Sequence, residues 1–381
     1  MENGSEKTLK PRFAYLDNIR SLVIILVVAM HVAVTYSGFG GWYYVEGSPE
    51  NLSVLEMVFF GLFQSFVQAW SMGALFFISA YLTTKALAKR STANYLKERF
   101  FRLGIPLLIY MFLIAPFIVF ALLGVNPDRS FANNYAKFIF DFSWLGATGP
   151  LWFVQVLLFL CIIYSILKKC IPKLVKLNNV SPINIIFSIT ITTIIAFFIR
   201  INIPIGSSFL NLQFAYFPSY IVMFIAGLII GENDLLENIT NEKNIKWLKL
   251  TLIIGIPLWA AIMIFGGALE GKEYYNGGFN WQNFAFASWE SFTAIGFSIG
   301  LIALFKKKVN IENKFTRLMR DNAFGIYCFH APILVGISLF FKNLVLTPVL
   351  KFAMIFILAS VFSLLFSFVV RKIKPIGLLY K

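Results

Sequence analysis

The chain has 381 residues, of which 59% are apolar and only 13% are charged, and its mean hydropathy is +0.76. This composition excludes an ordinary water-soluble domain and predicts an all-α, polytopic membrane protein. The formal net charge of +15 could suggest a nucleic-acid partner. The basic residues instead follow the membrane topology described below, so no nucleic-acid partner is expected.

The first twelve residues are polar and basic, and the apolar run after them has no small-residue cleavage pattern. We therefore expect a short cytoplasmic tail, 1–12, followed by a retained helix and not a signal peptide. The three cysteines, Cys161, Cys170 and Cys328, lack C-x-x-C spacing. They predict neither a disulfide framework nor a metal site.

Ten apolar segments are each long enough to cross the roughly 30 Å of hydrocarbon in a bilayer. Their expected bounds are 16–37, 53–84, 103–124, 149–167, 182–200, 213–231, 248–267, 282–305, 321–341 and 348–370. The second is longer than one crossing requires, which suggests a bend near Gly73. No soluble domain or internal repeat is visible, so residues 1–381 are predicted to form a single integral-membrane domain.

The distribution of lysine and arginine tests this topology. With ten helices and a cytoplasmic N-terminus, 27 of the 33 basic residues fall on the cytoplasmic side and six on the outer side. Cytoplasmic loops carry the excess of positive charge, so both termini are predicted to be cytoplasmic. The outer loops 38–51, 126–141 and 270–283 are rich in Trp, Tyr, Asn and Gly. They suit sugar binding, and equally an interfacial aromatic belt.

The first apolar segment carries a cation, Arg20, and a titratable imidazole, His31, on one face. Arg20, beside Asp17, and His31 are eleven residues apart, which places them on one helix face and roughly 16 Å apart along the axis. Ionisable groups inside a membrane are costly and usually functional. His31 is therefore a candidate functional residue near mid-depth, and the alternative is a buried histidine satisfied by a neighbouring helix.

Further candidates lie near the cytoplasmic mouth of the second and third segments. Arg99 and Arg102 form an R-x-x-R step, and two guanidinium groups on neighbouring helix positions can hold phosphate oxygens. The alternative is topological anchoring by positive charge. Ser79 and Tyr81 lie on the last turns of the second segment, where packing is the more common role of such residues.

Three more candidates come from later segments. Trp152 follows Pro150 at the start of the fourth segment, and it is either inward-facing or part of the aromatic belt. Tyr327 and His330 lie three residues apart in the ninth segment. His330 is ten residues beyond Arg320, so the two histidines of the chain are predicted at the same membrane depth.

Two carboxylates, Glu56 and Glu290, fall inside or at the ends of apolar segments toward the outer face. Either could orient an imidazole. Glu290 is favoured as the partner of His31 because the sequence WESF places it within the eighth segment instead of at its end.

Six stretches, taken in order, resemble the acyltransferase family 3 membrane proteins over about residues 13–370. They are YLDNIRSLVIILVVAMH, FFISAYL, KERFFRLGIPLL, GPLWFVQVLLF, YFPSYIVMFIAGL and FGIYCFHAPI. The family's arginine–ten residues–histidine pattern falls on Arg20 and His31, and its R-x-x-R on Arg99 and Arg102. The usual S-G-Y is here Ser79-Ala80-Tyr81, so the glycine is lost. GWYYVEGS and SMGALFF look similar to the branch that includes glucan-modifying succinyltransferases.

The resemblance implies an enzyme that moves an acyl group, acetyl or succinyl, from cytoplasmic acyl-CoA to a hydroxyl of an extracytoplasmic glycan or related acceptor. It implies a plasma-membrane location, acyl-CoA as a substrate, and no tightly bound cofactor or metal. The resulting catalytic candidates are His31 and Glu290, and the donor-binding candidates are Arg20, Arg99 and Arg102. Other site candidates are Asp17, Ser79, Tyr81, Trp152, Tyr327 and His330. The residue chemistry agrees, because imidazole is the usual base for a hydroxyl near neutral pH.

A transporter or exporter of a glycan or small metabolite is the alternative, because proline-broken helices and intramembrane ionisable groups would also fit it. No inverted repeat is visible, which argues against it. A membrane scaffold with packing histidines is a third interpretation. Transfer or hydrolysis of acyl-CoA by the purified protein separates the first from the other two.

Overall fold

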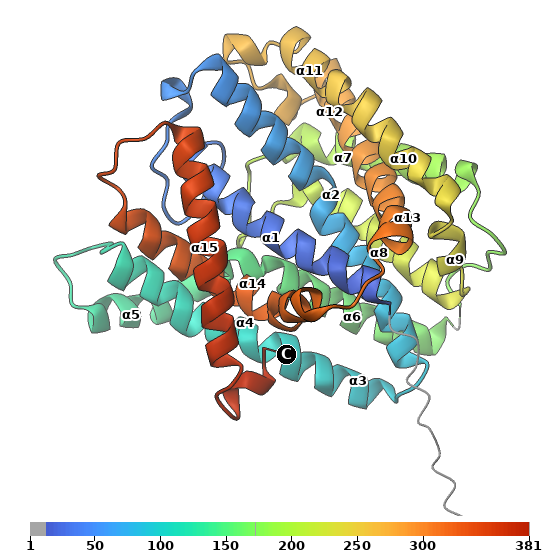
Figure 1. Ribbon diagram of the computed structural model, residues 1–381, viewed down its shortest axis with the longest axis horizontal. Coiled ribbons are helices and arrows are strands. Elements are labelled where there is room, and N and C mark those ends of the chain that lie inside the picture. Colours follow the sequence, from blue (N-terminus) through green and yellow to red (C-terminus); the bar gives the residue numbers. More distant parts are fainter. Residues whose placement is uncertain (1–12, 172, 381) are drawn as a thin grey trace, which may run out of the picture.

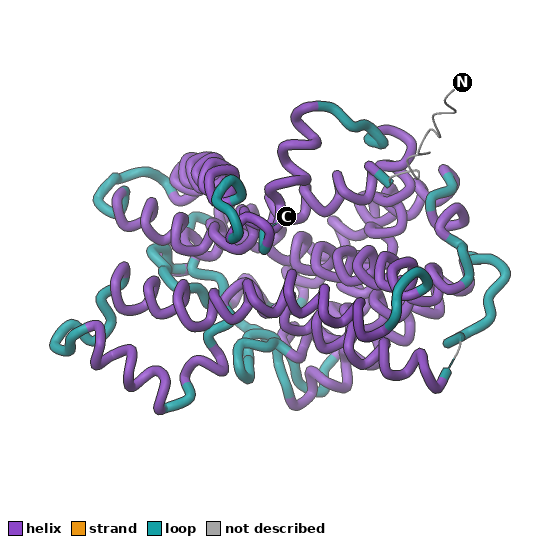
Figure 2. The backbone as a smooth tube through the Cα atoms, turned by 90° about the horizontal axis from the view of Figure 1, so that it is seen from below, coloured by secondary structure: helices purple, strands orange, loops and turns teal. Residues whose placement is uncertain are grey.

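The structure, a computed structural model, describes residues 13–171 and 173–380. The expected tail 1–12 lies outside these residues. The described chain is 77% helical and contains no strand, only an isolated bridge between Phe209 and Leu212. Figure 2 shows helices throughout, with loops between them. The all-α prediction is confirmed.

Within the described residues, ten helical spans are long and apolar enough to cross a membrane, as predicted. They are Ala14–Ser37, Val54–Leu87, Thr92–Leu122, Gly149–Cys170, Pro182–Asn202, Phe214–Glu232, Glu242–Phe265, Trp281–Lys308, Lys314–Phe340 and Pro348–Val370. The largest differences from the expected bounds are at the starts of the third and ninth spans, which begin at Thr92 and Lys314. Charged turns precede the apolar run in both, and hydropathy alone does not register such turns as helix.

Five spans are single helices: α1 (Ala14–Ser37), α2 (Val54–Leu87), α7 (Pro182–Asn202), α14 (Lys314–Phe340) and α15 (Pro348–Val370). The others combine helical segments, namely α3 (Thr92–Arg99) with α4 (Ile105–Ile109), α6 (Trp152–Cys170), α8 (Phe217–Glu232), α10 (Ile245–Leu250) with α11 (Ile256–Phe265), and α12 (Trp281–Phe292) with α13 (Ser298–Lys308). Two helices lie outside the spans, α5 (Phe131–Phe140) and α9 (Leu236–Ile239).

Prolines account for some of the irregular turns inside the spans. A π-helical turn, Phe100–Gly104, runs up to Pro106, and another, Thr251–Gly255, runs up to Pro257. Proline has no N–H to donate to the carbonyl four residues earlier, so the hydrogen-bond register shifts locally. The helices continue through these positions and still complete their crossings.

α1 lies at the centre of the bundle, where it packs against α2, α13, α14 and α15 (Figure 1). About 61% of its apolar span is buried inside the protein, against 22% for α15. α15 therefore offers most of its surface to lipid, whereas α1 carries its side chains into the protein interior. This central position places His31 within reach of other helices.

α2 makes its most extensive contact with α8. A β carbon on Gly227 of α8 would lie 2.3 Å from the carbonyl oxygen of Phe77, so only glycine permits this approach. α2 is assigned as one helix through Gly73, where the side chain of Met223 packs over the glycine. The close α2–α8 pair fixes one wall of the site described next.

Candidate active site

The two histidines of the chain meet between α1 and α14. The Nε2 atom of His330 lies 3.1 Å from the Nδ1 atom of His31, and the ring centroids are 5.1 Å apart. His330 is fully buried and His31 is partly buried. The sequence predicted only a shared depth for these residues. The packing of α14 against α1 brings the two rings within hydrogen-bonding distance.

The hydrogen-bond geometry assigns the protons on this pair. The Nδ1 atom of His330 lies 2.8 Å from the carbonyl oxygen of Tyr327, and a carbonyl can only accept. In neutral His330 the Nδ1 atom therefore carries the hydrogen and Nε2 carries the lone pair. That lone pair accepts the Nδ1–H of His31. Neutral His31 is then left with a free lone pair on Nε2, the atom a general base would use.

His31 faces a small cavity of about 50 Å³ inside the bundle. The other residues that line the cavity are Val27, Met30, Val67, Gln68, Ser71, Met72, Pro150, Trp152 and Tyr327. A water molecule takes up about 30 Å³ in the liquid. The cavity therefore has room for water or one small group, and a sugar or acyl chain requires it to widen.

Two predicted site residues, Trp152 and Tyr327, line this cavity with His31. The hydroxyl of Tyr327 donates to the carbonyl of Pro150 and so ties α14 to the start of α6. Trp152 stacks on Tyr220 of α8, with centroids 5.4 Å apart. The Tyr220 hydroxyl in turn accepts a hydrogen bond of 2.8 Å from Gln68 of α2. These contacts hold part of the cavity wall in place.

Sequence reasoning did not single out Trp42, yet this residue covers the histidine pair. Its ring stacks on His31 at 3.7 Å between centroids, and it lies within 11° of parallel to the ring of His330. Trp42 comes from the loop after α1. Gly38 ends that helix with φ of 73°, a left-handed conformation that turns the chain back over the helix end. In the sequence, the one feature that could have indicated this contact is a tryptophan four residues after a glycine that ends the helix.

Arg20, Arg99 and Arg102 gather at the end of the molecule where α1 begins. Arg99 and Arg102 are close enough to Arg20 for their charges to act on it. Arg20 also bonds to the carboxylate of Asp17 at 3.4 Å and is about half exposed. The predicted cluster of guanidinium groups is therefore assembled from α1 and from the third span.

Neighbouring side chains position the R-x-x-R pair. The Nε atom of Arg99 donates to the Tyr95 hydroxyl at 3.0 Å, and its guanidinium lies 5.1 Å from the Tyr95 ring centroid. Arg102 lies 3.6 Å from the carboxylate of Glu98 and is about half exposed. Arg99 is thus held against an aromatic face, whereas Arg102 reaches toward solvent.

Ser79 and Tyr81 do not line the cavity. The Ser79 carbonyl accepts from Thr83 in the same helix, at 2.8 Å. The buried Tyr81 ring contacts Phe13 edge-on at 5.9 Å and lies 5.5 Å beneath the ammonium of Lys85. Both residues lie near the end of α2, in helix-packing surroundings.

The expectation that Glu290 orients His31 is corrected by the structure. Glu290 on α12 forms an ion pair with Arg200 of α7, and both side chains are buried. The partner of the His31 ring is His330. Glu56, the second carboxylate considered, caps the start of α2 through Ser53. The sequence predicts the depth of these carboxylates in the membrane, but it does not indicate which helix each of them faces.

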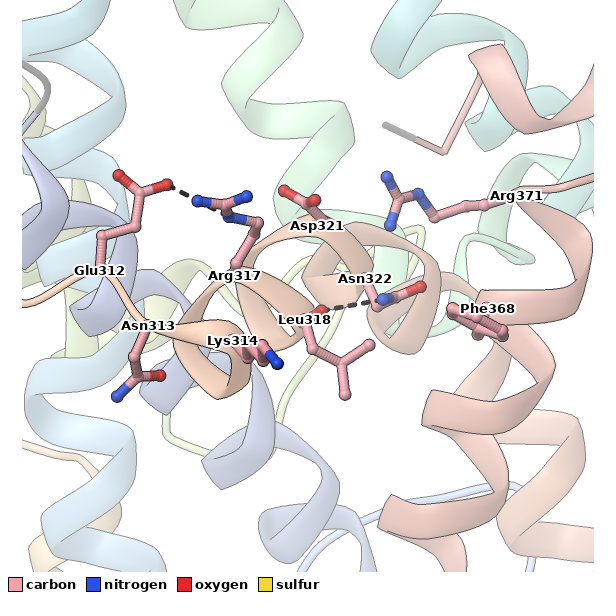
Figure 3. Close-up of a pocket in the computed structure, with 9 residues that line it drawn as sticks. All are labelled: Glu312, Asn313, Lys314, Arg317, Leu318, Asp321, Asn322, Phe368 and Arg371. Carbon is pink, nitrogen blue, oxygen red and sulfur yellow. Dashed lines mark hydrogen bonds and ion pairs between the residues drawn. The ribbon is translucent and has the colours of Figure 1, made fainter.

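A larger cavity, of about 570 Å³, lies elsewhere, between the first turns of α14 and the end of α15 (Figure 3). Its lining is mostly polar and charged: Glu312, Asn313, Lys314, Arg317, Leu318, Asp321, Asn322, Phe368 and Arg371. It shares no residue with the histidine cavity. Cavity size therefore does not locate the candidate chemistry in this protein.

Comparison with known proteins supports the resemblance seen in the sequence. Residues 13–372 match the family described as an acyltransferase domain, acyltransferase family 3. No curated protein and no solved structure matches the chain. The family match covers nearly the whole chain and includes the histidine pair and the three arginines. The chain therefore belongs to acyltransferase family 3, and it is a membrane acyltransferase.

Proposed function

We propose that the protein transfers an acyl group, acetyl or succinyl, from acyl-CoA to a hydroxyl of a glycan or related acceptor on the outer side of the plasma membrane. One observation carries the proposal, the histidine pair whose hydrogen-bond chain leaves the Nε2 lone pair of His31 free beside a cavity. The family match supports transfer over transport.

In the proposed reaction His31 is the general base. Its Nε2 atom takes the proton of the acceptor hydroxyl while the hydroxyl oxygen attacks the thioester carbon. The tetrahedral intermediate collapses as the carbon–sulfur bond breaks. The thiolate of coenzyme A then receives the proton from the His31 imidazolium, which returns the base to its neutral form. His330 is a positioning residue, because it accepts the Nδ1–H of His31 and holds the ring.

The donor is proposed to bind at the arginine cluster. Arg20, Arg99 and Arg102 supply guanidinium groups that suit the phosphates of coenzyme A. Arg20 and His31 lie eleven positions apart on one helix, or about 16 Å along its axis. The thiol-bearing arm of coenzyme A would run along α1 between the two. Asp17 orients Arg20 in this arrangement.

The excess of lysine and arginine on the loops at that end, 27 of 33, supports a cytoplasmic donor side with both termini cytoplasmic. Cysteine labelling from outside tests this orientation. Cys170 is exposed, so the probe variants are made in a Cys170→Ser background. Probes at Gly41 and Asn276 should react and one at Asn241 should not. Reaction at Asn241 would reverse the proposed topology.

The decisive experiment incubates purified protein in lipid nanodiscs with labelled acetyl-CoA or succinyl-CoA and a soluble glycan. We expect labelled acyl groups on the glycan and an equal amount of free coenzyme A thiol. The Arg99→Ala, Arg102→Ala double variant should bind coenzyme A more weakly, and lysine at both positions should restore binding only in part. Lys97→Ala removes a charge from the same helix and is the matched control. Absence of thiol release, together with glycan export from vesicles, would favour the transporter.

A further inference from the structure

Trp42 has an unusual place in the site. Its indole ring is nearly parallel to both imidazoles, at 20° to His31 and 11° to His330. It covers one face of the pair, whereas the cavity adjoins His31 from within the bundle. A substrate that reaches the Nε2 lone pair of His31 must therefore come close to this indole ring.

The indole N–H of Trp42 is buried and has no hydrogen-bond acceptor. Burying an unpaired donor is costly, so such a group normally finds a partner. Two of the donors that line the cavity already have acceptors, because Gln68 donates to Tyr220 and Tyr327 donates to Pro150. Trp247 and Trp259 also have unpaired indole N–H groups. Trp42 is set apart by its contact with His31.

The loop that carries Trp42 is fixed directly after this residue, at Tyr43 and Glu46. The Tyr43 hydroxyl bonds to that of Tyr110 at 3.2 Å, and the ammonium of Lys351 pairs with the carboxylate of Glu46. The backbone N–H of Glu46 donates to the carbonyl of Thr35 at 2.8 Å. Burial raises the pKa of Tyr43 to about 12, so its hydroxyl stays protonated near neutral pH. The indole is therefore held in place before any substrate binds.

The reaction proposed above creates a need for such a donor. When the acceptor oxygen attacks the thioester carbon, the carbonyl oxygen gains negative charge, and fixed N–H groups in a water-poor site stabilise that charge. A preorganised donor needs no reorientation when the charge appears. An aromatic cover over the imidazoles also limits the access of water, which would otherwise take the acyl group by hydrolysis.

We propose that Trp42 is a catalytic residue of this site: its indole N–H donates to the thioester carbonyl oxygen in the transition state, and its ring excludes water from the histidine pair. The inference rests on the proposed acyl transfer. It assigns two separable roles to one side chain, because phenylalanine retains an aromatic ring but has no N–H, whereas alanine has neither.

The test compares Trp42→Phe and Trp42→Ala with Trp281→Phe, a matched change at an outer-side tryptophan that is 55% exposed. Three quantities are measured: the transfer rate, acyl-CoA hydrolysis without acceptor, and coenzyme A affinity. Trp42→Phe should lower kcat for transfer about 10²-fold, as expected for loss of one oxyanion donor. Its KM for the donor and its hydrolysis-to-transfer ratio should stay at the wild-type level. Trp42→Ala should also raise that ratio, and Trp281→Phe should match wild type.

Each outcome has one meaning. A wild-type kcat in Trp42→Phe overturns the hydrogen-bond role, and an unchanged hydrolysis-to-transfer ratio in Trp42→Ala overturns the shielding role. If Trp42→Ala fails to fold, as judged by size in detergent, Trp42→Phe still tests the hydrogen-bond role. Trp42→Leu then replaces Trp42→Ala in the test of the shielding role. Wild-type protein that neither transfers nor hydrolyses acyl-CoA overturns the proposed function itself, and this inference with it.

Discussion

Two buried polar centres lie inside the helical bundle, and they differ in how their hydrogen-bonding capacity is used. Glu290 and Arg200 form an ion pair between α12 and α7. His31 and His330 form a one-way chain between α1 and α14, which ends in a free lone pair beside a cavity. Arg200 keeps one nitrogen unpaired but lines neither cavity described above. We therefore take a buried ionisable group to indicate chemistry only when part of it adjoins a cavity.

The surroundings of the ion pair point to a structural role. The guanidinium of Arg200 lies 5.5 Å from the ring centroid of Tyr216 and 6.0 Å from that of Phe286. Its Nε donates to the carbonyl of Ala215 at 3.1 Å, and its own carbonyl accepts from Gly278 at 3.0 Å. Arg200 thus connects the C-terminal end of α7 with the segments that precede α8 and α12. Loss of this centre should affect stability more than catalysis.

The largest expected effect is on catalysis at the histidine pair. His31→Gln keeps a polar side chain of similar size but removes the basic lone pair, so transfer should fall by about 10² to 10⁴-fold. Coenzyme A affinity and size in detergent should remain at wild-type values, because the arginine cluster is unchanged. His31→Ala should show the same loss. Near wild-type turnover in His31→Gln would make this histidine structural and move the search for the base to His330.

The second effect is on stability at the ion pair. Glu290→Gln leaves the Arg200 charge buried without its counter-charge, which typically costs about 3–5 kcal/mol of unfolding free energy. We expect a clear fall in the Tm of the purified protein, whereas the transfer rate per folded molecule should change little. The paired change Arg200→Met with Glu290→Leu should recover most of the lost stability, because apolar residues of similar volume can replace a buried ion pair. A large rate loss at unchanged Tm would instead give Glu290 a catalytic role.

The contrast between these centres also shows what the sequence could predict. The depth of His31 and His330 follows from counting residues from Arg20 and Arg320, because helix rise is constant. The ten spans follow from apolar length, and the arginine cluster from R-x-x-R spacing near one mouth. It was harder to predict which side chains on different helices contact one another. Arg200 lies near the C-terminal end of α7 and was counted with the predicted outer loops. Nothing in its spacing from Glu290 indicates that α7 packs on α12.

Side-chain partners across helices depend on how each helix is rotated about its axis. A soluble amphipathic helix reveals that rotation through its apolar stripe. Membrane helices such as α11 and α15 are apolar on nearly every face, so the stripe is weak. Trp42 was missed for a related reason, because a loop has no periodicity from which its fold over His31 could be inferred. Polar residues inside apolar runs, such as Gln68, were the stronger signal and indicate functional surfaces in a membrane helix.

The smallest expected effect distinguishes the two members of the histidine pair. If His330 only fixes the ring and proton of His31, its loss removes one hydrogen bond, worth about 1 kcal/mol. His330→Leu should then reduce kcat for transfer about fivefold, because about 1.4 kcal/mol corresponds to a tenfold change, and the KM for the donor should not change. His330→Gln offers a side-chain oxygen that can accept the Nδ1–H of His31, so it should recover much of the rate. A wild-type rate in His330→Leu would reduce the contact to packing. If both His330 variants lose as much activity as His31→Gln, the assignment is reversed and His330 is the base, which would place the reacting hydroxyl on the far side of the pair from the cavity.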